Sequence, residues 1–186
     1  HLPPADRAVE RVRLLGSAVA PGVIEKMLRV EAEHFGDVGA RALEHPIDPP
    51  VTLPSAQGPR TVHVRGRVDR VDWTDGHAIR VVDYKTGRRP TQALQPGVYA
   101  HALVQQEAAA GRTVTIAPSG FVAFREEVPW IESVRTSDDA DGQARAFVEA
   151  VDAIESGAFP VKPQNPFRCQ FCEYPGVCRK DYVGDE

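Results

Sequence analysis

The sequence predicts an α/β sandwich, in which helices flank a central mixed β-sheet. Two segments rich in β-branched residues are joined by Asp75-Gly76, a dipeptide typical of a tight hairpin turn. A long segment with helical spacing follows, and shorter strand and helix patterns come after it. The order strand, strand, helix, strand, helix is typical of an α/β domain.

The N-terminal part should contain two helices, because apolar residues recur at helical spacing in residues 7–15 and 22–35. Residues 44–59 then carry five prolines. Proline lacks the backbone N–H that helices and central strands need, so we expect only a short or edge strand there, at residues 51–53. The remaining expected elements are strands at 61–73, 78–85, 113–116 and 120–124 and helices at 94–110 and 138–157.

The composition is that of an ordinary globular chain, with 186 residues, 42% of them hydrophobic and 26% charged. We expect a core domain at 1–160 and a cysteine-rich tail at 161–186 that packs on it. No apolar run is long enough for a membrane span and no export signal opens the chain, so a cytoplasmic location is expected. With a net charge of −4, any contact with nucleic acid must use a local basic surface.

Two carboxylates and an ammonium group converge in the predicted hairpin. When the chain folds back at the turn, positions whose numbers sum to about 151 or 152 face each other, so Asp69 lies opposite residue 82 or 83. Side chains alternate along a strand, so Asp83 and Lys85 share one face. Mg²⁺ usually takes one or two carboxylates and completes its shell with water and phosphate oxygens. The cluster therefore suits metal-dependent hydrolysis, with Lys85 orienting or activating water or neutralising phosphate charge.

A structural explanation competes with the catalytic one. Ladders of ion pairs are common at strand ends, and Arg67, Arg70 and Arg80 are available as partners for the same carboxylates. A lone D-x-K pattern is more often structural than catalytic. The motifs around it decide between the two explanations.

Three motifs follow one another in the middle of the chain. They are Gly66-Arg67-Val68-Asp69-Arg70-Val71-Asp72, then Val82-Asp83-Tyr84-Lys85-Thr86-Gly87, then Gln95-x-x-x-Tyr99. Together they resemble the RecB-type branch of the PD-(D/E)XK nuclease superfamily, over residues 44–99. The resemblance implies a restriction-endonuclease-like sandwich and a deoxyribonuclease that depends on Mg²⁺ or Mn²⁺.

The resemblance also assigns roles to individual residues. The implied metal ligands are Asp69, Asp83 and the backbone carbonyl of Tyr84. The implied catalytic set is Asp69, Asp83, Lys85, Gln95 and Tyr99. Gln95 and Tyr99, four residues apart on one helix face, would face the site and the DNA backbone. Arginines around the hairpin would bind phosphates, namely Arg67, Arg70, Arg88 and Arg89.

The three cysteines, Cys169, Cys172 and Cys178, all lie in the last eighteen residues. Their C-x₂-C-x₅-C spacing is typical of metal ligands, but zinc and [4Fe–4S] sites normally take four protein ligands. The tail resembles that of AddB-type and small CRISPR-associated nucleases, in which a distant upstream cysteine completes a [4Fe–4S] cluster. We therefore expect such a cluster in an intact parent protein, with zinc or no metal in this chain as alternatives.

The nuclease family that these motifs resemble also has a metal-binding histidine in an upstream helix, often as Gly-x-x-x-His. Residues 16–20 have this outline but end in Ala20, and His34 is a weak substitute. Either the ligand is lost, or this chain is the C-terminal part of a longer protein. We prefer the second explanation, because one truncation accounts for both the missing histidine and the missing cysteine.

Two functions follow from the sequence. The favoured one is a metal-dependent nuclease acting on single-stranded or duplex DNA ends, as an exonuclease in recombination and double-strand-break repair. Its helicase would be another segment or subunit, because the chain has no G-x-x-x-x-G-K-[ST] loop. The alternative is a catalytically impaired module that binds DNA or a partner. The retained D-x-K with Gln95 and Tyr99 favours the enzyme.

Overall fold

The computed structural model describes residues 3–75, 77–87, 90, 94–158, 166–174 and 178. The chain divides into two compact units, His1–Val148 and Glu149–Glu186. The predicted boundary between core and tail, at residue 160, stays a prediction. None of the helices in the described ranges combines the length and the hydropathy that crossing a bilayer would require.

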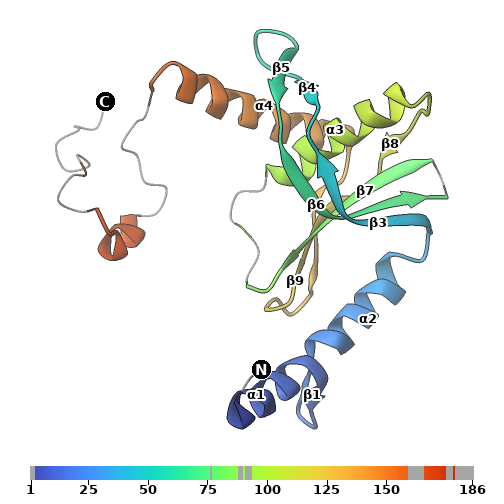
Figure 1. Cartoon of the computed structure of the whole chain (residues 1–186), viewed down its shortest axis with the longest axis vertical. Coiled ribbons are helices and arrows are strands. Elements are labelled where there is room, and N and C mark those ends of the chain that lie inside the picture. Colours follow the sequence, from blue (N-terminus) through green and yellow to red (C-terminus); the bar gives the residue numbers. More distant parts are fainter. Residues whose placement is uncertain are drawn as a thin grey trace. The chain divides into compact units, whose positions relative to one another are not determined.

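The first unit is built on a six-stranded sheet with the order β10-β9-β7-β6-β3, and β8 pairs with β7 beside β9 (Figure 1). Its strands are β3 Val38–Ile47, β6 Gly66–Thr74, β7 Ala78–Lys85, β8 Thr115–Ile116, β9 Ser119–Ala123 and β10 Trp130–Val134. Antiparallel pairing joins β3 to β6, β6 to β7 and β9 to β10, whereas β8 and β9 run parallel to β7. The predicted mixed sheet is confirmed.

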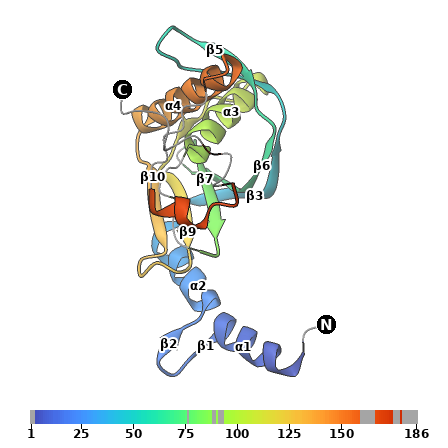
Figure 2. The same cartoon turned by 90° about the vertical axis from the view of Figure 1, so that its left-hand side faces the viewer.

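Three helices flank this sheet: α2 Val23–His34, α3 Gln95–Ala109 and α4 Ser137–Glu155. Helix α3 is the crossover that parallel pairing of β7 and β9 requires. It lies beside α4 in both views (Figures 1 and 2). The two helices approach closely because Gly97 has no side chain: a Cβ there would lie 2.9 Å from the carbonyl oxygen of Ala140.

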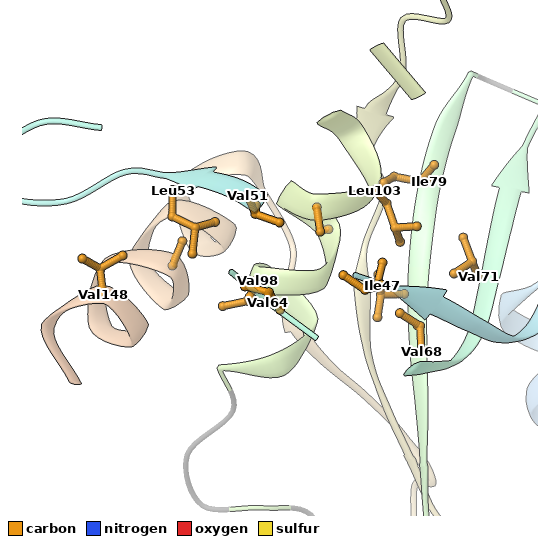
Figure 3. Packing of buried hydrophobic residues seen from close by; sticks show 14 residues of the cluster. Ile47, Val51, Leu53, Val64, Val68, Val71, Ile79, Val98, Leu103 and Val148 are labelled. Atoms are coloured by element: carbon orange, nitrogen blue, oxygen red, sulfur yellow. The ribbon is translucent and has the colours of Figure 1, made fainter. Parts of the chain in front are cut away.

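The main apolar core lies between the sheet and the pair α3 and α4. Leu103 of α3 lies there next to Ile79 of the sheet, Val98 of α3 lies next to Val64, and Val148 of α4 belongs to the same cluster (Figure 3). A second, smaller apolar cluster lies on the other side of the strands and consists of Val30, Phe35, Val82, Val122 and Trp130. Consecutive residues of β7 alternate between the clusters, as the pleat of a strand requires.

The remaining elements are two small hairpins, one helix and one short 3₁₀ helix. Their bounds are α1 Pro4–Leu15, β1 Gly16–Ser17, β2 Ala20–Pro21, β4 Pro50–Leu53, β5 Arg60–His63 and η1 Pro166–Phe171. The β4–β5 hairpin packs on α3, where the side-chain amide of Gln105 both donates to and accepts from the backbone of Thr52 (2.8 and 2.9 Å). This pairing satisfies backbone groups on a strand edge.

Two predictions about the strands were wrong. The segment at 61–73 is not one strand: its first part is β5, which pairs with β4 in a separate two-stranded sheet, and its second part is β6. Strands β3 and β10 were not expected. Nine of the ten residues of β3 are not buried and Ile47 is the one that is, so no alternation of apolar and polar residues marks this strand.

The N-terminal motif with the outline Gly-x-x-x-Ala also differs from expectation. Residues 16–20 form part of the β1–β2 hairpin and not a helix. Gly16 has a φ of +81°, and a Cβ there would lie 2.5 Å from the backbone nitrogen of Gly22. Glycine is therefore required here by the turn, and the motif carries no information about a helical metal ligand.

Candidate active site

The β6–β7 hairpin brings the predicted acidic residues to adjacent positions. Its strand pairs, from Trp73–Ile79 to Arg70–Val82, all sum to 152, one of the two predicted registers. The next residue of β6 is Asp69 and the next residue of β7 is Asp83. Both residues therefore lie where the regular ladder between the two strands ends.

Asp83 and Lys85 form an ion pair on one face of β7. The Nζ atom of Lys85 lies 2.6 Å from Oδ2 of Asp83, and the Lys85 side chain keeps 33% of its surface exposed. The same ammonium lies 5.8 Å above the ring of Phe121, which pairs with Asp83 in the parallel ladder to β9. The ammonium therefore contacts an aromatic ring as well as a carboxylate.

Asp69 takes part in the sheet through its side chain. Its Oδ2 accepts the backbone N–H of Tyr84 at 2.8 Å, so a side-chain hydrogen bond joins β6 to β7 here. On the other side of β6, Glu44 lies between the pairs Leu43–Arg70 and His45–Val68 and has a φ of +52°. Such a left-handed conformation is uncommon outside glycine and often marks functional sites. The backbone around Asp69 thus departs from a regular ladder.

The electrostatics of Asp83 are those of a carboxylate that needs a cation. Burial raises the pKa of Asp83 above its ordinary value, Lys85 opposes this increase, and the charge of Asp69 adds to it. Within the described residues, Oδ2 of Asp83 is buried and accepts no hydrogen bond of standard geometry, although Lys85 lies within ion-pair distance. A divalent ion would compensate both carboxylates, so these residues fit such an ion.

A magnesium site would need few protein donors. In the ranges that the structure describes, no three His, Cys, Asp or Glu side chains are grouped closely enough to hold a metal. Mg²⁺ needs only one or two carboxylates, and water or phosphate oxygens fill the other positions. His34 does not contribute here: it lies at the end of α2 with its ring 6.4 Å from that of Trp130.

The two predicted helix residues lie in the first turns of α3. The hydroxyl of Tyr99 lies directly over Gly66, because a Cβ on that glycine would be 2.6 Å from the Tyr99 oxygen. Gly66 begins β6, three residues before Asp69, so the structure brings Tyr99 to the strand that carries an acidic residue of the site. Gln95 is exposed one turn earlier. The roles of both residues stay predictions.

The predicted phosphate-binding arginines have different environments. Arg67 is exposed and has a weak ion pair with Glu44 at 3.7 Å. Arg70 is fully buried and bound by acidic side chains, so it offers no surface to a phosphate and does not belong to a DNA-binding set. Arg88 and Arg89 lie outside the described residues.

Sequence reasoning missed the group of residues that holds Arg70. Its members are Glu31, Asp72 and Tyr84, which reach the Arg70 guanidinium from α2, β6 and β7. One signal was present in the sequence. Arg70 and Asp72 are two residues apart on a strand, so they share a face, and a charged pair of this kind can be buried together.

The fold and these residues define a class: an α/β sandwich with two carboxylates and a lysine at the end of its central hairpin suits a metal-dependent nuclease. The family model described as the PD-(D/E)XK nuclease superfamily matches residues 4–179. The chain belongs to this superfamily, and its sandwich is restriction-endonuclease-like as predicted. It is also 29% identical over 147 residues to the Gene 69 protein of Mycobacterium phage L5. That match covers 78% of this chain and 49% of the phage protein, so the chain spans about half of its relative.

The three cysteines of the tail lie in the second unit. The N–H of Cys172 donates to the carbonyl of Cys169 at 3.4 Å, and that of Cys178 donates to the carbonyl of Tyr174 at 3.2 Å. All three thiols are free. In the described part of the tail they are not grouped as a metal site. The predicted iron–sulfur cluster therefore stays a proposal.

Proposed function

We propose that this chain is the nuclease domain of a RecB-type enzyme that hydrolyses DNA phosphodiester bonds with Mg²⁺ or Mn²⁺. The observation that supports this most is the ion pair between buried Asp83 and partly exposed Lys85, next to the carboxylate of Asp69. A structural ion pair does not need a second carboxylate that raises the pKa of the first. In a metal site the ion offsets the repulsion between two such carboxylates.

The proposed mechanism gives each group a separate task. Asp69, Asp83 and the carbonyl of Tyr84 would hold the metal beside the scissile phosphate. The bound metal would supply an acidified water and stabilise the charge that develops on the phosphate. The Lys85 ammonium would orient the attacking water and donate hydrogen bonds to phosphate oxygens. Tyr99, anchored over Gly66, would position the DNA backbone from α3.

The finer functional assignments belong to the same proposal. Arg67 would bind phosphates of single-stranded or duplex DNA ends, so binding should weaken steeply with salt. The domain would act as an exonuclease in double-strand-break repair, in the cytoplasm, together with a helicase segment or subunit. Cys169, Cys172 and Cys178 would bind a [4Fe–4S] cluster when a fourth ligand is present. A visible absorption band that Cys172→Ser removes would support the cluster, whereas bound zinc in a colourless protein would contradict it.

The second candidate function is a DNA- or partner-binding module without catalysis. Its supporting observation is the small donor set: among the described residues, no third His, Cys, Asp or Glu side chain is grouped with Asp69 and Asp83 closely enough to hold a metal. Such a module would bind DNA with the same dependence on salt but would leave it intact.

Cleavage of a labelled single-stranded oligonucleotide separates the two functions. We expect cleavage in Mn²⁺ or Mg²⁺ and none in EDTA, and a loss of about 10²–10⁴-fold in rate for Lys85→Ala and for Asp83→Asn. Arg29→Ala is the matched control, because it also removes a cationic side chain, but an exposed one on α2 that has no proposed role in the site. This variant should cleave normally. Thermal unfolding shows that each variant is folded. A Lys85→Ala protein with the normal rate would remove Lys85 from the mechanism, and a wild type that binds but never cleaves would favour the module.

A further inference from the structure

The side of the sheet opposite Asp83 and Lys85 carries the side chain of Tyr84. Its ring stacks on Phe124 with the planes 2° from parallel and the centroids 6.3 Å apart. Its hydroxyl accepts a hydrogen bond from Nη1 of Arg70 at 3.0 Å. Tyr84 is therefore fixed at both its ring and its hydroxyl, while its own backbone N–H is bound by the Asp69 carboxylate.

Arg70 is the centre of this arrangement and has no exposed surface. Its Nε and Nη2 donate to Asp72 at 2.8 and 2.6 Å, and Nη1 and Nη2 both reach Glu31 of α2. The guanidinium also lies 4.3 Å over the ring of Phe35, just after α2. Burial acts to lower the pKa of Arg70, but these bonds outweigh it and raise the pKa, so the group stays charged. A guanidinium with rigidly directed donors fixes the positions of its partners.

This cluster is connected to the proposed metal site by neighbouring peptide units. Arg70 directly follows Asp69, and Tyr84 directly follows Asp83. Helix α2 reaches the same region a second time, since Nζ of Lys26 donates to the carbonyl of Phe124 at 2.9 Å. The N–H of Phe124 in turn donates to the carbonyl of Lys85 at 3.1 Å. The backbone on both sides of the site is thus attached to α2.

We propose that Glu31, Arg70 and Tyr84 are positioning residues that set the separation of the Asp69 and Asp83 carboxylates from the opposite face of the sheet. The inference rests on the proposed metal-dependent function. Metal affinity depends on how well the groups behind the ligands hold them in place, and changes to such groups commonly cost 10–100-fold in affinity or activity. Helix α2, which contributes none of the proposed ligands, would in this way control their geometry.

A purely structural role for the cluster makes a different prediction, and Arg41 provides the comparison. Arg41 donates to the same two acidic residues as Arg70, to Glu31 at 2.9 Å and to Asp72 at 2.8 Å. No bond from Arg41 to Tyr84 is among those of the described residues. Loss of Arg41 should therefore weaken the attachment of α2 without changing the contact to the proposed metal site.

The test compares Tyr84→Phe and Glu31→Gln with Arg41→Gln in the full chain. Two readouts need no catalysis: the Mn²⁺ concentration that gives half of the metal-induced rise in Tm, and hydrogen exchange of the residue 84 amide without metal. We expect the two cluster variants to need about 10-fold more Mn²⁺ and to exchange this amide faster. Arg41→Gln should stay within about 2-fold of wild type in both, even with a lower Tm. The Mn²⁺ concentration for half-maximal cleavage should follow the same order.

The outcomes distinguish failure of the inference from failure of the proposed function. If wild type binds Mn²⁺ and cleaves DNA, but Tyr84→Phe and Glu31→Gln match Arg41→Gln in Mn²⁺ requirement and exchange, the cluster is only structural and the inference is wrong. If wild type neither gains Tm with Mn²⁺ nor cleaves, the proposed function is wrong and the inference fails with it. Glu31→Gln also decides the case if Tyr84→Phe does not fold.

Discussion

On the face of the sheet covered by α3 and α4, fourteen buried apolar residues pack together (Figure 3). On the face covered by α2, the corresponding cluster among the described residues has five buried apolar members. Ion pairs of Arg70 and Arg80 supply further contacts on this face. Arg70 and Arg80 each form an ion pair with an acidic residue. The guanidinium groups of both also lie over the ring of Phe35, at 4.3 and 5.2 Å from its centroid. Apolar packing sets how much volume is filled, whereas directed ionic bonds set where each group lies.

The proposed active site lies between these two kinds of contact. Asp83 shares its side of β7 with Val81 and Ile79, which belong to the large apolar cluster, and Tyr84 points to the charged side. We expect the apolar face to contribute most of the free energy of unfolding, and the charged face to fix the positions of the side chains near the proposed site. Substitutions on the two faces should therefore differ in size, in dependence on pH and in their effect on metal binding.

The largest effect on stability is expected from Arg70→Met. Among the contacts of the described residues, this change leaves the fully buried Asp72 with Arg41 as its remaining ion-pair partner, so the free energy of unfolding should fall by about 3–5 kcal/mol. Urea denaturation measures the loss. Arg70→Met/Asp72→Leu removes both buried charges and should recover more than half of it, because a buried ion pair is replaceable by apolar groups. If the double variant is as unstable as the single one, the charged face stabilises the fold in a way that desolvation does not explain.

A cavity in the apolar face should cost nearly as much. Leu103→Ala removes a side chain of α3 that is 1% exposed, and the expected loss is about 2–5 kcal/mol in the free energy of unfolding. In contrast to the charged face, this loss should not change between low and high salt, since no charge is involved. A loss that depends strongly on salt would contradict the distinction between the faces. The Mn²⁺ requirement of this variant should stay close to that of wild type.

Stability on the charged face should depend on pH through Asp37. Both oxygens of this carboxylate accept hydrogen bonds from Arg80 at 2.8 Å, and these bonds hold the pKa of Asp37 below its ordinary value of 3.8. A lowered pKa in the folded state adds stability above the unfolded value, and this stability is lost as the pH falls through the folded value. Asp37→Asn should therefore cost less than about 1 kcal/mol at pH 7, because the carboxylate is half-exposed, and nothing well below pH 3.8. Equal losses at pH 7 and pH 2.5 would show that charge is not the cause.

The smallest effect is expected from the exposed ion pair on the outer side of α2. Arg29 and Glu25 lie 3.0 Å apart with more than half of each side chain exposed. Arg29→Ala should change the free energy of unfolding by at most about 0.5 kcal/mol, as is usual for such helix pairs. Thermal unfolding checks this value. A loss above about 1 kcal/mol would mean that the outer side of α2 contributes to its attachment, and the contrast between the faces would be weaker.

Several parts of the structure could be predicted because local patterns decide them. Helix α3 was expected at 94–110 and lies at Gln95–Ala109, and β7 was expected and found at 78–85. Strand β3 could not be predicted, because it is an edge strand exposed over most of its length and its partner β6 follows it by many residues. The break between β5 and β6 could not be predicted either, since valines continue through both strands and only the separate pairing of β5 with β4 divides them.

The sequence by itself determined that Asp83 and Lys85 share a face and that Asp69 lies near them, because the two-residue period of a strand and a short turn leave little choice. Only the tertiary structure decided the position of Arg70. An arginine on a strand has the same local pattern whether it binds DNA at the surface or carboxylates in the interior. Glu31, which holds it inside, is 39 residues away in the sequence and comes close only when α2 packs on the sheet.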